Sequence, residues 1–167
     1  MLYLDHTDSP LGPITMASDG VNLTGLWFDG QKYFPEFPES VQKKSRLPVF
    51  EDTRRWLHLY FSGTAPTFLP DLAPAGTPFQ QDIWEILRSI PYGETRTYGQ
   101  IAELYAQKHG ILRMSAQAVG GAVGHNPISI LIPCHRVVGA DGSLTGYAGG
   151  LDKKRRLLEM EQTPKIP

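Results

Sequence analysis

Alternating apolar and polar residues mark the first thirty positions of the chain. The apolar residues fall into three short runs: Leu2 and Leu4; Ile14 and Met16; and Val21, Leu23, Leu26 and Phe28. Alternation of this kind is typical of strands that bury one face. Ser18-Asp19-Gly20 provides a turn between two of the runs. We therefore predict a small antiparallel sheet at the N-terminus.

The spacing becomes helical after residue 50. Between Glu51 and Phe61, large apolar side chains fall on one side of a helix, which predicts a single helix packed on the sheet. Residues 62–78 contain four prolines and two glycines and show no period, which is typical of a linker. We place a domain boundary near Ala75, so that the domains comprise residues 1–75 and 76–167.

The second half is predicted to be helical, which makes the chain an α+β protein. Thr77 and Thr97 are N-cap candidates for two helices, which end at Pro91-Tyr92-Gly93 and at His109-Gly110. A third helix is predicted over 115–124. Three short helices joined by tight turns suit a helix-turn-helix, although helical bundles without affinity for DNA share this pattern.

Composition and charge add little to this picture. The chain is 41% hydrophobic and 20% charged, as globular domains are, and its net charge of -1 alone favours no nucleic-acid partner. The halves differ, however. Residues 1–76 carry six Lys and Arg against nine Asp and Glu, whereas the remainder carries ten against eight. Any surface that faces DNA is therefore expected in the second half.

The sequence lacks targeting features. Residues 1–10 have no basic and apolar segments of a signal peptide, and no stretch approaches the roughly 18 apolar residues of a membrane span. A single cysteine excludes an internal disulfide and suits a compartment that keeps thiols reduced. We expect a soluble, cytoplasmic monomer with no membrane partner.

The candidate chemistry lies around that cysteine. An apolar run leads to Pro133, which fixes the backbone just before Cys134. His135 and Arg136 follow, and a nearby base or positive charge lowers the pKa of a thiol. On composition alone, a reactive nucleophile and an inert core cysteine are equally favoured.

The motifs around Cys134 are more specific than its composition. Residues 133–138 read Pro-Cys-His-Arg-Val-Val, and further motifs flank them: Gly93-Glu94-Thr95, Thr97-Tyr98, Ala118–Ala122, Asn126-Pro127 and Gly146–Leu151. In content and order they resemble the O6-alkylguanine-DNA alkyltransferase family, strongly over 77–161 and in outline before that. The resemblance implies a ribonuclease-H-like N-terminal domain and a winged-helix-like C-terminal domain for DNA binding and alkyl transfer.

The family's activity defines what to expect of this chain. The resemblance implies a methylated-DNA–protein-cysteine S-methyltransferase that moves the alkyl group of O6-alkylguanine in double-stranded DNA onto Cys134. O4-alkylthymine and larger alkyl groups are left open. The alkylated atom lies within the base stack, so the nucleotide must be flipped out. The thioether product is a poor leaving group, so each molecule acts once. No cofactor is needed, because the damaged base is the alkyl donor.

The resemblance also assigns roles to single residues. His135 takes the proton of Cys134 through a bound water, and Glu161 orients the imidazole. Tyr98 donates a hydrogen bond to the flipped base, and Tyr147 stacks over it. The further implied substrate contacts are backbone carbonyls near Cys134 and Val137, a pocket near Val123 and Ser129, and Asn126, which braces the turn between the recognition helix and an active-site strand.

By resemblance, the helix over 116–124 enters the minor groove. Its adjacent glycines cost about 1 kcal/mol each relative to alanine, and close approach to DNA or close packing within the protein explains them equally well. The implied DNA contacts are Gln117, Arg113, Ala118, Gly121 and Arg136. Gln117 stands where many members carry an arginine that fills the place of the flipped base. Phosphate contact and an internal ion pair are both open for Arg136.

Other interpretations stay open from the residues. A cysteine hydrolase would turn over, an alkyltransferase-like damage-binding protein lacks the nucleophile, and a helix-turn-helix regulator would not need Cys134. Some relatives bind zinc through cysteines of the first domain that are absent here, so His6 and His58 are expected to be ordinary histidines and no metal is expected. The basic run 153–156 favours a solvated helix face over phosphate binding.

Overall fold

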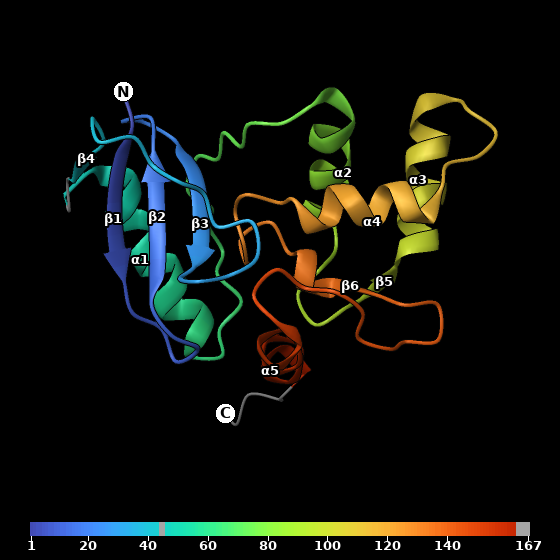
Figure 1. Cartoon of the computed structure of the whole chain (residues 1–167). Coiled ribbons are helices and arrows are strands. Elements are labelled where there is room, and N and C mark those ends of the chain that lie inside the picture. The colour runs from blue at the N-terminus through green and yellow to red at the C-terminus, as the bar shows by residue number, and fades with distance from the viewer. Residues whose placement is uncertain (44–45, 163–167) are drawn as a thin grey trace.

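The computed structural model describes residues 1–43 and 46–162 and shows an α+β architecture, with a sheet and one helix beside a helical half (Figure 1). None of the helices within these ranges is both long and apolar enough to cross a membrane. The elements in chain order are β1 (Tyr3–Thr7), β2 (Ile14–Ser18), β3 (Leu23–Phe28), β4 (Gln42–Lys43), α1 (Pro48–Phe61), α2 (Pro78–Arg88), β5 (Arg96–Thr97), α3 (Tyr98–His109), α4 (Ala116–Gly124), the 3-10 helix η1 (Cys134–Arg136), β6 (Val137–Val138) and α5 (Leu151–Gln162).

The predicted N-terminal strands form, with one difference in topology. The sheet order is β3-β2-β1-β4, and β1, β2 and β3 pair antiparallel. The predicted antiparallel pairing is therefore confirmed, and a fourth strand outside the predicted region, β4, pairs parallel to β1. Gly20 has a φ of 106° in the predicted turn between β2 and β3. Val21 lies in the same turn and is 72% exposed, so it does not belong to the buried alternation.

Capping residues set the ends of the predicted helices. Thr77 and Thr97 each accept a hydrogen bond from the backbone N–H of a glutamine in the first turn, and the glutamine side chain accepts one from the threonine N–H in return. Gly110 ends α3 in the left-handed conformation. Ser115 caps α4. The three predicted helices of this half are therefore confirmed. In the other half α1 covers the sheet and begins at Pro48, three residues earlier than predicted.

The segment predicted as a linker is docked on the sheet. Leu23 of β3 exchanges two backbone hydrogen bonds, of 2.8 and 2.9 Å, with residues 71–73. Farther along the same strand, Leu26 exchanges two more with residues 127–129. The edge of the N-terminal sheet therefore holds the segment that leads to Cys134.

One hydrophobic core runs through both halves. It joins buried residues of the sheet and α1 to buried residues of α2, α3, α4 and α5. A smaller cluster around Leu4, Ala17 and Trp27 lies within the N-terminal half alone. Since apolar burial is the main force that stabilises a fold, the larger core is incomplete in either half without the other. The halves should therefore unfold together.

We predict that Leu26→Ala lowers the free energy of unfolding by about 2–5 kcal/mol, because Leu26 is fully buried where the halves meet. The matched variant Val21→Ala should change it by less than about 0.5 kcal/mol, because Val21 is exposed. Urea unfolding followed by tryptophan fluorescence and by circular dichroism should give one coincident transition for all three proteins. Separate transitions for the two probes would contradict a shared core.

Candidate active site

Cys134 begins η1 at the end of a buried segment. Every residue from 128 to 138 is buried, and Cys134 itself is 6% exposed. The predicted active-site strand is wrong, because the chain passes through tight turns here and β6 begins only at Val137. Ile130 has a φ of 69°, a strained conformation for a β-branched residue. The cysteine is thus held by a rigid, irregular backbone.

Asn126 fixes these turns from within. Its side-chain amide donates hydrogen bonds to the carbonyls of Ile128 (3.2 Å) and Ile132 (2.8 Å). Its side-chain oxygen accepts one from the N–H of Ile128 at 3.0 Å. The residue therefore makes the bracing contacts that its place before Pro127 suggests.

The Cys134 thiol is protonated in the resting protein. Burial raises the pKa of the thiol, and a hydrogen bond with Asn126 and the positive charge of Lys154 only partly oppose this. Neighbouring groups do lower the pKa of this cysteine, but the expected net lowering is wrong for the resting state, because burial outweighs them. The proton must leave during any reaction of the sulfur, so the site needs a proton acceptor.

His135 is placed to be that acceptor. Its Nε2 lies 2.6 Å from Oε2 of Glu161, and both side chains are fully buried. Because the carboxylate oxygen accepts, Nε2 carries the proton of the neutral imidazole and Nδ1 carries the lone pair. Burial lowers the pKa of His135 and outweighs the opposing effect of Glu161. The ring is therefore neutral at rest. Within the described ranges, the buried Nδ1 has no hydrogen-bond partner.

The Glu161 carboxylate collects hydrogen bonds from three segments of the chain. Oε1 accepts from Nε of Arg136 (2.8 Å) and the N–H of Gly93 (3.2 Å). Oε2 accepts from the Tyr60 hydroxyl (2.5 Å) and Nη2 of Arg136 (3.1 Å), besides His135. Burial alone would raise the pKa of Glu161, but His135 and Arg136 hold it at about 2. The carboxylate is therefore ionised and fixed in orientation.

Arg136 forms an internal ion pair with Glu161, which is one of the two roles left open for it. Besides its bonds to Glu161, it donates through Nη1 to the carbonyl of Ile90 at 2.8 Å. It is 8% exposed. The expected contact of Arg136 with DNA is wrong for this structure, because its donor groups serve the interior.

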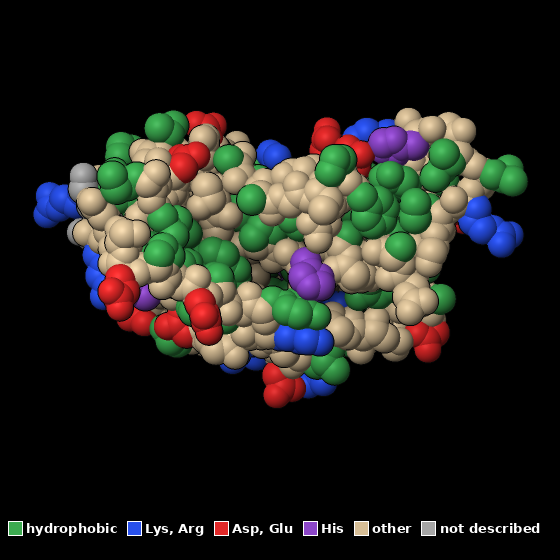
Figure 2. All heavy atoms as spheres, turned by 45° about the horizontal axis from the view of Figure 1, so that its top comes forward, with side chains coloured by type: hydrophobic (Ala, Val, Ile, Leu, Met, Phe, Trp, Pro, Cys, Tyr) green, Lys and Arg blue, Asp and Glu red, His purple; other side chains and the backbone are tan. Residues whose placement is uncertain are grey.

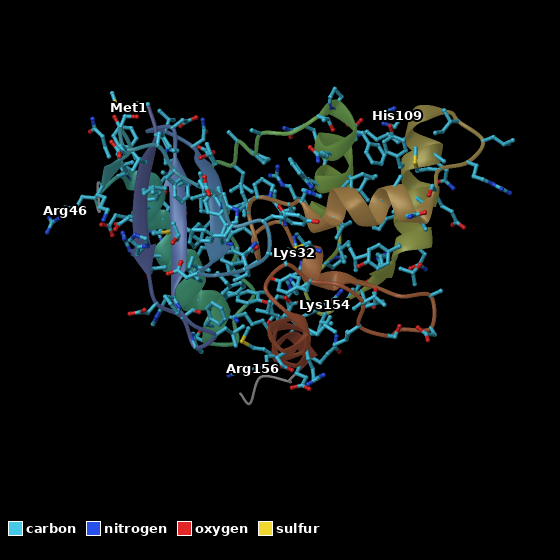
Figure 3. The ribbon with its side chains drawn as sticks, in the orientation of Figure 1. Met1, Lys32, Arg46, His109, Lys154 and Arg156 are labelled. Atoms are coloured by element: carbon cyan, nitrogen blue, oxygen red, sulfur yellow. The ribbon has the colours of Figure 1, made fainter. Side chains whose placement is uncertain are left out.

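Lys154 departs from the solvated face predicted for residues 153–156. Its side chain is buried, and Nζ donates to the carbonyls of Thr145 (3.0 Å) and Gly146 (3.2 Å) in the loop between β6 and α5 (Figure 3). Burial lowers the pKa of Lys154 to about 8. Helical spacing could have revealed it, because Lys154, Leu157 and Glu161 share the buried face of α5.

Cys134 opens onto a cavity of about 290 Å³. Five residues expected to serve the substrate line it together: Tyr98, Val123, Asn126, Ser129 and Tyr147. Val137 does not line it, since its side chain is fully buried in β6. The Tyr98 hydroxyl donates to the carbonyl of Thr145 at 3.0 Å, so a bound base would have to compete with that carbonyl for its proton.

Part of the cavity wall comes from the N-terminal half, which the sequence did not indicate. Lys32 and Tyr33 line the cavity, and the Tyr33 ring stacks on His125 with ring centroids 4.1 Å apart. The backbone N–H of Lys32 donates to the carbonyl of Ala148 at 2.9 Å, which joins the loop to the C-terminal half (Figure 3). The loop has no periodic pattern from which this contact could be predicted.

A larger cleft of about 980 Å³ lies between residues 65–74 and α2. Aromatic side chains line it, among them Trp56, Phe68, Trp84 and Tyr92. Cys134 is not among its lining residues. We therefore place the chemistry in the smaller cavity, where the nucleophile is.

The exposed side of α4 carries most of the expected DNA contacts. Gln117, Ala118 and Gly121 are exposed, as is Arg113 in the preceding loop. In the view of Figure 2, apolar side chains and backbone cover much of the helical half, with basic side chains at its outer edge. A Cβ placed on Gly121 would meet no atom within 4 Å. Packing within the protein therefore does not explain this glycine.

Both halves of the chain match models of one protein family. Residues 2–70 match the ribonuclease-like domain of 6-O-methylguanine DNA methyltransferase. Residues 78–163 match the DNA binding domain of 6-O-methylguanine DNA methyltransferase. The two matches together cover more than half of the chain, and the second contains every residue described around Cys134 except Tyr60, Lys32 and Tyr33.

Individual relatives are similar over nearly the whole chain. The methylated-DNA–protein-cysteine methyltransferase of Haemophilus influenzae is 44% identical over 167 residues, which cover 99% of this chain and 89% of the relative. The structure of Mycobacterium tuberculosis OGT in complex with DNA is similar with a TM-score of 0.82 and 43% identity, over 96% of this chain and 92% of that one. The Mycobacterium tuberculosis O6-methylguanine methyltransferase structure gives a TM-score of 0.80 and 42% identity, over 99% and 97%.

The charge on Lys154 predicts the reactivity of the thiol. The rate of Cys134 alkylation by iodoacetamide should rise with pH through a midpoint above the value of about 8.5 for free cysteine. Lys154→Met should slow the reaction below pH about 8, where the wild-type ammonium is charged and favours the thiolate. Lys153→Met is the matched control and should leave this rate unchanged, because Lys153 lies over Phe28 instead. A midpoint below 8.5, or a rate below pH about 8 that Lys154→Met does not lower, would contradict this description.

Proposed function

The chain belongs to the 6-O-methylguanine DNA methyltransferase family, and on that premise we propose how its own residues carry out the reaction. It is a DNA repair methyltransferase whose acceptor is a protein cysteine. Cys134 is the one cysteine of the sequence. The observation that carries the proposal is its buried thiol, which faces the cavity and adjoins the His135–Glu161 pair.

Alkyl transfer is a displacement at carbon. The sulfur of Cys134 attacks the alkyl carbon from the side opposite O6, the carbon–sulfur bond forms, and the carbon–O6 bond breaks. The electron pair of that bond remains on guanine, which takes up the proton that His135 has received from the thiol and stays in the DNA as the normal base. The thiol proton passes to Nδ1 of His135 through a water, and Glu161 balances the charge of the imidazolium. Atoms and charge are conserved, so no cofactor takes part.

The cavity supplies contacts for a flipped guanine. Tyr98 is neutral, since burial raises the pKa of its hydroxyl, and it would turn from Thr145 to donate to the base as charge develops there. Tyr147 would cover the ring, and Val123 and Ser129 would limit the size of the alkyl group. A backbone carbonyl near Cys134 would accept from the guanine amine, whereas Val137, which does not line the cavity, is not assigned this contact.

Duplex DNA would lie against α4. Gly121 allows the helix backbone to come close to the minor groove, because it has no side chain and no other atom of the protein fills the space beside it. Gln117 is exposed in the first turn and would fill the place of the flipped base by hydrogen bonding to the orphaned partner. Arg113 would contact phosphate from the preceding loop.

The alkyl thioether has no route back to the thiol, so one molecule repairs one lesion. This chemistry requires a reduced cysteine, which supports our proposal that the protein acts in the cytoplasm. We also propose that the chain divides near Ala75 into a domain of residues 1–75 and a domain of residues 76–167 that carries the DNA-binding and transfer residues.

The proposal is tested by mass measurement on the intact protein and its peptides. Incubation with a duplex that contains one O6-methylguanine should add one methyl group per molecule, confined to the peptide with Cys134. Cys134→Ser should remain unmodified while it still binds the duplex. Binding without modification of the wild type would favour a damage-binding protein, and demethylation without modification of the protein would favour a turnover enzyme.

The two α4 residues can be separated by their effects on stability and repair. Gly121→Ala should stabilise the helix by about 1 kcal/mol, because alanine is the better helix former and the site has room. It should nevertheless slow repair of duplex DNA, because the added methyl group faces the groove. Gln117→Ala should leave stability nearly unchanged and also slow duplex repair. Thermal unfolding and single-turnover rates check both, and wild-type rates for either variant would refute its role.

A further inference from the structure

Tyr60 brings a side chain of the N-terminal half into the active-site network. It lies on α1, is fully buried, and its ring stacks on Trp56 with centroids 5.2 Å apart. Its hydroxyl donates to Oε2 of Glu161 at 2.5 Å and lies 3.4 Å from Nε2 of His135. Glu161 is 101 positions farther along the chain. This contact therefore depends entirely on the docking of the two halves.

We propose that Tyr60 is a positioning residue of the transfer reaction, whose hydroxyl fixes the Glu161 carboxylate and moderates how strongly that carboxylate holds a proton on His135. The proposal rests on the function proposed above, in which His135 accepts the thiol proton. It gives the N-terminal half a direct part in the chemistry, besides its role in stability.

The geometry makes Tyr60 a donor to Glu161. Burial and the adjacent Glu161 charge raise the pKa of its hydroxyl far above the usual value, so the phenol stays neutral. The Tyr60 hydroxyl and Nε2 of His135 both donate to Oε2 of Glu161. This is the oxygen that must balance the charge of the imidazolium. A hydrogen bond to a carboxylate oxygen withdraws negative charge from it, so the Tyr60 bond weakens the hold of that oxygen on the histidine proton.

The charges around His135 define the expected pH dependence. Glu161 favours the imidazolium, whereas Arg136 from η1 and Lys154 from α5 oppose it. The hydrogen bond from Tyr60 on α1 reduces the effect of Glu161 on the imidazolium. Of the other titratable groups, Cys134 directly precedes His135 in the chain. Tyr92 and Tyr147 interact electrostatically with Glu161. Loss of the Tyr60 hydroxyl leaves more charge on Oε2, so the pKa of His135 should rise.

The experiment uses full-length protein in excess over a duplex with one O6-methylguanine. The dependence of the single-turnover rate on protein concentration separates transfer at saturation from DNA binding. Tyr60→Phe should lower the saturating rate about tenfold, as loss of an outer hydrogen-bond partner does at other sites, with an unchanged half-saturating concentration. The acid limb of its rate profile should move to higher pH. Tyr105→Phe, which removes a hydroxyl from α3 beside Phe79 and His109, is the matched control and should match wild type.

A second variant keeps the ring in place. Incorporation of 3-fluorotyrosine at position 60 makes the phenol a stronger donor, and it should move the acid limb to lower pH. This arm decides the matter if Tyr60→Phe does not fold.

The outcomes separate this inference from the function on which it rests. An unmodified wild-type Cys134 would refute the function itself. A methylated wild type with an unshifted acid limb in both Tyr60 variants would overturn the positioning role, even if Tyr60→Phe reacts slowly, because loosened packing alone explains slow transfer.

Discussion

The structure around the active site depends on one buried negative charge. An ionised carboxylate in the interior is tolerated only when it is paired and fully hydrogen-bonded. Glu161 meets this condition with donors from α1, from the turn before β5 and from η1. Each donor fixes the position of the segment that supplies it. The requirement that this charge be satisfied therefore also sets the orientation of His135 beside the nucleophile.

The two halves of the chain serve one site. Strand β3 holds the segment before Cys134 by backbone hydrogen bonds, α1 reaches Glu161 through Tyr60, and the loop with Lys32 closes one side of the cavity. The C-terminal half supplies the nucleophile, the base and the surface of α4. A protein that acts once per molecule needs no fast release of product, so rigidity at Cys134 carries no penalty in turnover.

Local signals predicted the fold better than the site. The caps at Thr77 and Thr97 and the strands β1 to β3 depend on neighbouring residues, and the structure has them. The expected burial of one face fails for β2, which is buried along its whole length. The motif around Cys134 indicated the family. Tyr60 carries no motif, because its role arises from a contact between distant segments, and Lys154 is marked only by its place on the buried face of α5. The thiol pKa was misjudged because the sequence shows the charged neighbours, whereas burial decides the outcome.

The central claim is that a protonated thiol loses its proton to His135 within the transfer step. The direct test is the single-turnover methyl transfer rate of the wild type as a function of pH. Since the pKa of Cys134 is raised, a reaction of free thiolate would accelerate about tenfold per pH unit between pH about 7 and 9. Our account predicts a rate that is level across this range, or that falls as Lys154 loses its charge near pH 8. A tenfold rise per pH unit would contradict it.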